Sequence, residues 1–221
     1  MSKVPWTRTR EILKFLFWSD LGSLLGLITK QLDVVLVGFF GGPTQAGYYR
    51  LAKSVGSLPG VVISPLQSVT YQRFSRLLTT GSNNLLNALQ RVALLVALPL
   101  AALTLLLVPF VPFALRIVAG PRYAPAAPAA QVLVALSAVW MLTLWLKPIA
   151  FTLHEVHAWA LAAGLTAGLS LVGFLSLTPS FGFQGAAWAR FAAVTMGQII
   201  LVFYLIRRHG NGKVLEPVTQ E

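Results

Sequence analysis

Residues 92–115 read VALLVALPLAALTLLLVPFVPFAL, 24 residues without a charge between Arg91 and Arg116. A helix needs about 20 mainly apolar residues to cross the hydrocarbon core of a bilayer. The composition of the whole chain agrees with this, because only 10% of its 221 residues are charged, against about 25% in a soluble domain. The chain is therefore predicted to be an all-α, polytopic membrane protein.

Five further segments of similar character lie on either side of this stretch. Short turns separate two pairs of them, Gly41-Gly42-Pro43-Thr44-Gln45 and Thr178-Pro179-Ser180-Phe181-Gly182. Six transmembrane helices are thus predicted within one bundle, residues 15–207, after a basic cytoplasmic segment (1–14) and before a polar tail (208–221). The predicted spans are approximately 15–40, 46–72, 92–113, 125–147, 157–177 and 184–206.

The distribution of Lys and Arg predicts the orientation of the chain. With both termini cytoplasmic, eleven of the 17 basic residues fall in inner segments, four within spans, and only Arg116 and Arg122 in outer loops. Cytoplasmic loops of multi-pass proteins carry such an excess. We expect a bacterial cytoplasmic (inner) membrane location, which also accounts for the net charge of +11 without nucleic-acid binding.

Apart from Asp20 near the inner edge, five charged residues lie within the predicted spans: Lys30, Asp33, Arg50, Lys53 and Arg190. A charge that faces lipid at mid-depth costs about 2.5–3.5 kcal/mol, so these side chains are expected to face one another, water or the headgroups. Lys30 and Asp33 are three residues apart and share a helix face, as do Arg50 and Lys53 on the next span. The two faces can meet across the short turn.

Two interpretations of these charges are open. In one, Lys30, Arg50, Lys53 and Arg190 line a cationic, water-filled cavity that binds phosphate or pyrophosphate, since Arg and Lys bind such groups by charge and hydrogen bonds. In the other, Lys30 and Asp33 form a structural pair while the remaining cations extend to the interface, which we favour for Arg190 taken alone. Asp33 either couples transport to a proton or Na⁺ gradient or balances Lys30.

The remaining motifs predict packing rather than chemistry. Three Gly-xxx-Gly pairs, which begin at Gly22, Gly56 and Gly164, permit close helix contact, and tryptophans such as Trp159 near span ends are typical of interfacial anchors. The stretch His154-Glu155-Val156-His157 lacks metalloprotease spacing, and the chain has no cysteine and no Walker-type phosphate loop. We expect no metal, no cofactor and no enzymatic activity.

Several motifs, in their order along the chain, resemble a known family. They are Gln31-Leu32-Asp33, Gly47-Tyr48-Tyr49-Arg50-Leu51-Ala52-Lys53, Tyr71-Gln72-Arg73-Phe74-Ser75-Arg76-Leu77, Gly120-Pro121-Arg122-Tyr123-Ala124-Pro125-Ala126 and Gly182-Phe183-Gln184-Gly185-Ala186-Ala187. This order resembles the C-terminal half of the polysaccharide (lipid-linked oligosaccharide) flippases, Wzx-like lipopolysaccharide biosynthesis proteins of the multidrug/oligosaccharidyl-lipid/polysaccharide exporter superfamily.

The resemblance implies one bundle of a fold built from two six-helix bundles around a central cavity. It also implies a partner, either a separate N-terminal half or a second copy in a homodimer. The implied substrate is a polyprenyl-pyrophosphate-linked oligosaccharide, a lipid-linked glycan moved across the cytoplasmic membrane by alternating access.

Three other functions stay open. They are a multidrug or cation antiporter of the same superfamily, an inactive or assembly half-transporter, and a membrane enzyme of envelope synthesis. The surplus of basic residues within the spans counts against a cation carrier, and the short outer loops, which carry no acid, count against an enzyme.

Overall fold

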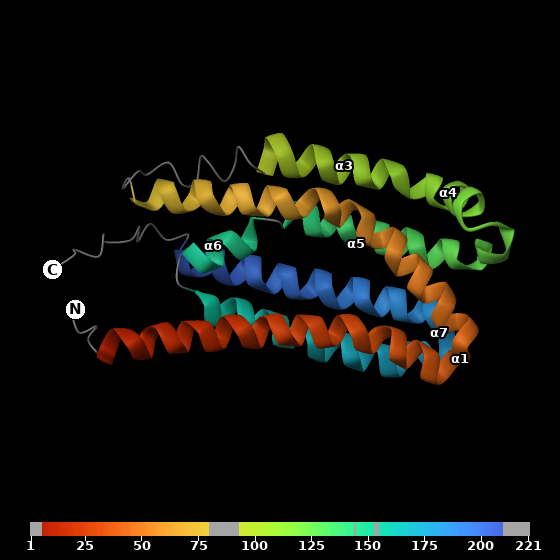
Figure 1. Ribbon diagram of the computed structural model, residues 1–221, viewed down its shortest axis with the longest axis horizontal. Helices are drawn as coiled ribbons and strands as arrows, with labels where there is room; N and C mark the ends of the chain where they lie inside the picture. The colour runs from red at the N-terminus through yellow and green to blue at the C-terminus, as the bar shows by residue number, and fades with distance from the viewer. Residues whose placement is uncertain (1–5, 80–92, 144, 153–154, 210–221) are drawn as a thin grey trace.

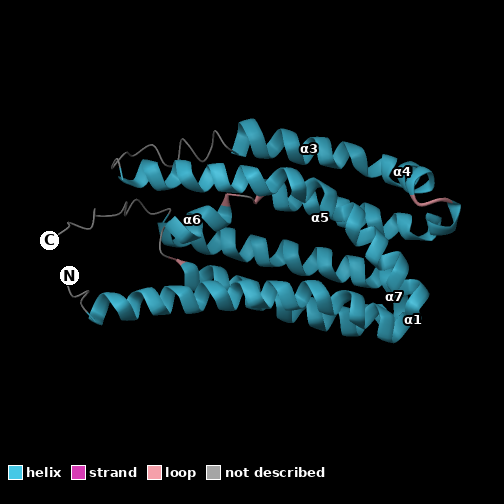
Figure 2. Ribbon diagram, viewed as in Figure 1, coloured by secondary structure: helices cyan, strands magenta, loops and turns pink. Residues whose placement is uncertain are grey.

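The structure, a computed structural model, describes residues 6–79, 93–143, 145–152 and 155–209, and all regular elements within these ranges are helices (Figure 2). In chain order they are α1 (Trp6–Thr79), η1 (Ala93–Ala97), α3 (Leu98–Leu107), η2 (Val108–Phe110), α4 (Val111–Val118), η3 (Pro121–Ala126), α5 (Ala127–Leu142), α6 (Leu146–Thr152) and α7 (Val156–His209). The basic N-terminal segment, the polar tail and the loop before η1 lie partly or wholly outside the described residues.

Helix α1 runs to one end of the bundle and then turns back, and Figure 1 shows its two arms on different sides of α7. Its 74 residues contain one with non-helical backbone angles, Gly42, at φ 79° and ψ 176°. The Lys53 ammonium lies 2.8 Å from the Asp33 carboxylate, although 20 residues of straight helix would separate them by about 30 Å. Only glycine adopts such backbone angles without strain, so Gly42 permits the reversal within the predicted turn.

Helix α7 reverses in the same way. Its non-helical residue is Gly182, at φ 58° and ψ −143°, at the end of the second predicted turn. A Cβ atom on Gly173 would lie 2.8 Å from the Cβ of Ala189. In a straight helix these two residues, 16 apart in sequence, would be about 24 Å from each other. The two arms of α7 therefore pack directly on each other.

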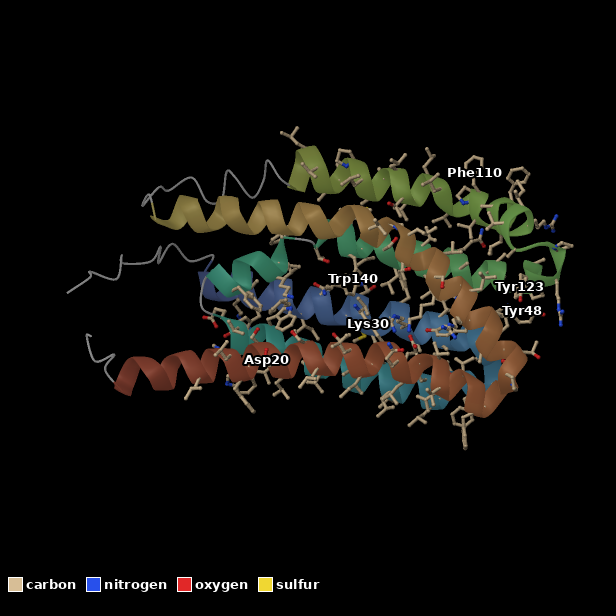
Figure 3. The ribbon with its side chains drawn as sticks, in the orientation of Figure 1. Asp20, Lys30, Tyr48, Phe110, Tyr123 and Trp140 are labelled. Carbon is tan, nitrogen blue, oxygen red and sulfur yellow. The ribbon has the colours of Figure 1, made fainter. Side chains whose placement is uncertain are left out.

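Among the described residues, three glycines have a positive φ, namely Gly42, Gly120 and Gly182, and each lies at a turn. Polar and aromatic contacts join the residues around these turns. The Gln45 side-chain oxygen accepts a hydrogen bond of 3.2 Å from the backbone N–H of Phe183. The ring of Tyr48 lies 6.0 Å from that of Tyr123 and 5.8 Å from that of Phe183, and Figure 3 shows the two tyrosines side by side at one end of the bundle. Three of the motifs that carry the family resemblance, those that begin at Gly47, Gly120 and Gly182, thus meet at this end.

The predicted span at 125–147 is interrupted in the structure. Helix α5 ends at Leu142, the backbone N–H of Thr143 bonds to the carbonyl of Val139 at 3.1 Å, and the short helix α6 follows from Leu146. Pro148 supplies the physical reason, because proline has no N–H to donate to the preceding turn.

Four described helical stretches are long and apolar enough to cross a membrane: Leu16–Val61, Leu95–Val118, Pro121–Leu142 and Val156–Leu205. Their outer surfaces expose large apolar side chains, among them Phe39, Val61 and Val118, which are 81%, 72% and 85% exposed. A soluble protein rarely leaves such a surface open to water, so the fold is that of an all-α membrane protein. The first and last stretches have 46 and 50 residues, about twice what one crossing requires.

The predicted glycine pairs divide into two kinds of position. In two of the pairs the first glycine packs closely: Gly22 lies against Trp159 and Gly56 against Leu133, where an added Cβ would meet the Leu133 Cβ at 2.6 Å. An added Cβ on Gly26 or Gly60, the second glycine of two pairs, would meet no atom within 4 Å, and both glycines line pockets. One glycine therefore brings the helices together while the other leaves space between them.

Candidate functional site

Asp33, on the outward arm of α1, is the centre of a buried polar site. The residue is 0% exposed. Its carboxylate lies 2.8 Å from the ammonium of Lys53 and 2.5 Å from a guanidinium nitrogen of Arg190. It also accepts hydrogen bonds of 2.7 Å from the backbone N–H of Val34 and 3.3 Å from the hydroxyl of Tyr49. Both oxygens are therefore saturated by donors from three different chain segments.

The fold explains why these groups meet. Asp33 and Lys53 lie on opposite arms of α1, close to the reversal at Gly42, while Arg190 follows the reversal of α7 at Gly182. The side chains of Lys53 and Arg190 are 26% and 11% exposed, so both charges depend on Asp33 for neutralisation. An ion pair buried in this way requires good geometry and further hydrogen bonds to offset its desolvation.

Lys30 lies one helical turn before Asp33 and adds a third cation. Its ammonium is 5.4 Å from the centroid of the Trp140 ring, a cation–π arrangement that Figure 3 places near the middle of the bundle. Its backbone carbonyl accepts a hydrogen bond from the ammonium of Lys53. We name Lys30, Asp33, Lys53 and Arg190 the cationic cluster, which has a net charge of +2.

Three pockets share Lys30. The first, with a volume of about 150 Å³, lies between the outward arm of α1 and α7; we name it the hydroxyl pocket for its lining Thr29, Thr166 and Ser170. The second, of about 250 Å³, lies against α5 and is lined by Lys53 and Arg190; we name it the central pocket. The third, of about 520 Å³, is an open groove on α1.

The open groove holds Arg50, the last predicted site residue. Arg50 is exposed and lines the groove with Lys30 and Lys53, beside Gln31, Ser54 and Ser57. Arg50 is not among the described groups that contact Asp33. Three of the four predicted cations thus lie in the cluster, Lys30 and Lys53 on the two arms of α1 and Arg190 on α7, and Arg50 lies beside it.

Two of the sequence interpretations are wrong. Asp33 makes its ion pairs with Lys53 and Arg190 within the described residues, so the carboxylate does not serve as a local partner of Lys30. Arg190 does not extend to the interface, because its guanidinium turns inward to Asp33. The reason lies in the tertiary structure. The two helix reversals bring Lys53 and Arg190 into contact with the carboxylate, whereas Lys30, one turn away on the same helix, is not in contact with it.

The sequence interpretation missed Tyr49, Trp140 and Ser170. Tyr49 stands in a motif that the resemblance rests on, and its burial beside Asp33 gives it a function in the site. Trp140 lies at the end of α5 and reads as an interfacial anchor, but its ring lines two pockets with Lys30. No local sequence signal distinguishes Ser170 from any other serine in an apolar helix.

A second polar cluster joins the first turn of α7 to its last turns, at the end of the helix pair away from Gly182. Glu155, which is 5% exposed, lies 3.2 Å from the imidazole of His157 and accepts a 3.5 Å hydrogen bond from the hydroxyl of Tyr204. The contact joins the start of α7 to its returning arm. His154, the other histidine of the predicted stretch, lies outside the described residues.

A family model described as "Polysaccharide biosynthesis protein" matches residues 2–128 of the chain. No curated protein and no solved structure gives a significant match. The matched region contains Lys30, Asp33, Arg50 and Lys53, whereas Arg190 lies beyond it. Because the match covers more than half of the 221 residues, this chain belongs to the polysaccharide biosynthesis protein family.

Proposed function

We propose that the chain is a flippase that moves a polyprenyl-pyrophosphate-linked oligosaccharide across the bacterial cytoplasmic membrane, and that it acts as a transporter and not as an enzyme. One observation carries the proposal: two cations contact one fully buried carboxylate, and a third, Lys30, lies one helical turn away against Trp140, so the cluster keeps a charge of +2 in an apolar bundle. Such a surplus is costly inside a membrane and is offset when an anion binds. A diphosphate supplies that charge and accepts the several hydrogen bonds that Arg and Lys donate.

Membership of a polysaccharide biosynthesis family supports a glycan as the attached group. The lipid-linked intermediates of polysaccharide assembly carry their sugar on a diphosphate, which combines the anionic chemistry that the cluster binds with a polyprenyl tail that stays in the bilayer.

Six spans with both termini cytoplasmic are part of the proposal. The doubled arms of α1 and α7 would supply two crossings each, with the stretches Leu95–Val118 and Pro121–Leu142 supplying one each. The bias of Lys and Arg toward the segments that are inner in this topology supports the orientation. Alternating access then requires only that the bundle rocks against a partner around the fixed cationic cluster.

A second bundle, from another copy of the chain or from a separate protein, would face the open groove. The groove exposes Gln31, Arg50, Ser54 and Ser57 on helices that are otherwise apolar. A guanidinium and three other polar groups do not face lipid tails without cost. We propose that this polar side of α1 lines the cavity between two bundles.

A multidrug or cation antiporter is less well supported. Such a carrier needs an acidic side chain that can hold its substrate. Asp33 already accepts two ion pairs and two hydrogen bonds, so a cation would have to displace Lys53 or Arg190 to reach it.

Diphosphate binding tests the proposal directly. The purified chain in phosphatidylcholine nanodiscs is titrated with a polyprenyl diphosphate and with the corresponding neutral polyprenol. We expect binding that requires the diphosphate, and a loss of about tenfold or more in affinity for Lys30→Gln, because a hydrogen bond to a charged group contributes about 1.5–3 kcal/mol. The control is Arg116→Gln, which removes an exposed cation at the end of α4. Equal binding of the alcohol and the diphosphate would refute the proposal.

A further inference from the structure

The hydroxyl pocket has a composition unlike that of the cationic cluster beside it. The rings of Trp140 and Trp159 form part of its wall, and polar groups from both arms of α7 and from α1 face it, namely Thr29, Thr166, Ser170 and Gln198. Aromatic faces attract the C–H groups of a polar ring, because they carry partial negative charge, while hydroxyl and amide groups pair with hydroxyl groups. This combination is that of a site for a sugar ring.

The two threonines present acceptors to the pocket. The Thr29 hydroxyl donates its hydrogen to the carbonyl of Leu25 at 2.7 Å, and the Thr166 hydroxyl donates to Ala162 at 2.8 Å. Since each hydroxyl also has two lone pairs, both oxygens can still accept a hydrogen bond from a ligand. The amide of Gln198 offers a donor and an acceptor in the same wall.

Ser170 supplies the observation that points to a ligand. The residue is 1% exposed and lines the pocket, yet its hydroxyl has no hydrogen-bond partner among the described residues. A serine in a helix ordinarily donates to a carbonyl one turn earlier, and a buried hydroxyl without a partner costs about 1–3 kcal/mol. A hydroxylated ligand in the pocket would remove that cost.

The pocket also has room for such a group. Its volume of about 150 Å³ is an order of magnitude above the roughly 10–15 Å³ that admits one water. Gly26 maintains part of this space, because an added Cβ there would meet no atom within 4 Å.

The hydroxyl pocket adjoins the proposed diphosphate site directly. Lys30, Trp140 and Arg190 line both the hydroxyl pocket and the central pocket. A diphosphate held by Lys30 and Arg190 would therefore place the group bonded to it at the entrance of the hydroxyl pocket.

We propose that the hydroxyl pocket, formed by Trp140, Ser170 and Gly26 with their neighbours, binds the first sugar of the lipid-linked glycan, the pyranose bonded to the diphosphate. The inference rests on the proposed function and adds to it a separate subsite that recognises the sugar. The cationic cluster then supplies affinity for any lipid diphosphate, and the hydroxyl pocket selects the one that carries a sugar.

The test compares two ligands on the same nanodisc-embedded chain: a polyprenyl diphosphate and its N-acetylglucosamine conjugate. We expect the wild type to bind the conjugate about tenfold more tightly. Ser170→Ala removes the hydroxyl that the sugar would engage and should reduce this preference severalfold, while affinity for the plain diphosphate stays unchanged. Thr178→Ala is the matched control, because its hydroxyl is also buried and without a described partner but does not line the pocket.

A second variant fills the space. Gly26→Leu places a side chain in the pocket and should bring the preference for the conjugate close to one, whereas Gly168→Leu makes the same change at an exposed position of α7 with open space around it. Equal wild-type affinity for both ligands would overturn the sugar subsite and leave diphosphate binding intact. Retention of the full preference by Gly26→Leu and Ser170→Ala would place the sugar elsewhere. Failure to bind either ligand would refute the proposed function as well.

Discussion

Asp33→Asn tests the electrostatic basis of the site. The substitution preserves the shape of the side chain and removes the charge that two cations share, so the net charge of the cationic cluster rises from +2 to +3. Both cations lose the charge of Asp33: Arg190, whose side chain is 11% exposed, is left with a largely buried charge, and Lys53, at 26% exposure, with a partly exposed one.

The expected cost follows from burial. Removal of one partner of a buried ion pair typically costs about 3–5 kcal/mol. Since water partly reaches Lys53, and asparagine still accepts one hydrogen bond, we expect the lower end of that range, about 3 kcal/mol. This corresponds to a change of roughly a hundredfold in the unfolding equilibrium, at about 1.4 kcal/mol per tenfold.

The assay is reversible unfolding of the detergent-solubilised chain. Asp20→Asn is the control, because it makes the same change on the same helix at an exposed position and should cost less than about 0.5 kcal/mol. Addition of Arg190→Gln to Asp33→Asn should restore most of the lost stability, since it removes the charge left without a partner. A loss below about 1 kcal/mol for Asp33→Asn, or a double variant whose loss equals the sum of the single losses, would refute the reasoning.

Three further predictions concern the turns, the packing and transport. Gly182→Ala should destabilise the chain by about 1–3 kcal/mol in thermal unfolding, and by more than Gly42→Ala. The new Cβ at Gly182 would also collide with the side chain of Gln45 on α1, whereas a Cβ at Gly42 would meet no atom within 4 Å; equal effects would contradict this. Gly56→Leu should prevent close packing of α1 on α5 and reduce the yield of folded protein, whereas Gly60→Leu, where an added Cβ meets no atom within 4 Å, should not; similar yields would count against the packing. Arg50→Glu should abolish transport of lipid-linked glycan in cells while membrane insertion, followed by immunoblotting of membrane fractions, stays normal; retained transport would remove Arg50 from the pathway.

Much of the fold could be predicted from apolar run length and turn residues. The stretches around Gly42 and Gly182 were predicted as turns, and both glycines have backbone angles that only glycine adopts readily. The break between α5 and α6 was missed, because residues 125–146 carry no charge and look like one continuous span. Pro148 interrupts the helix in the turn that precedes it, and not at its own position.

The charged residues of the candidate site could be predicted from the sequence, but their pairings and the aromatic and hydroxyl residues beside them could not. Spacing by three residues predicted shared helix faces for Lys30 with Asp33 and for Arg50 with Lys53; in the structure Lys30, Arg50 and Lys53 line one groove, and Lys53 pairs with Asp33 across the turn. The choice of partner depended on Arg190, which is 157 residues from Asp33 in sequence. No local pattern reveals such a contact, and the same holds for the approach of Trp140 to Lys30.

Transport itself is tested most directly by the leaflet distribution of lipid-linked glycan in the cells that make this chain. The chain is depleted, and the glycan exposed on each face of the cytoplasmic membrane is measured by its accessibility to an impermeant sugar-modifying enzyme. Our account predicts accumulation on the cytoplasmic face, reversed by re-expression of the wild-type chain and not by Arg50→Glu. An unchanged distribution after depletion would contradict the assignment of this chain as the flippase.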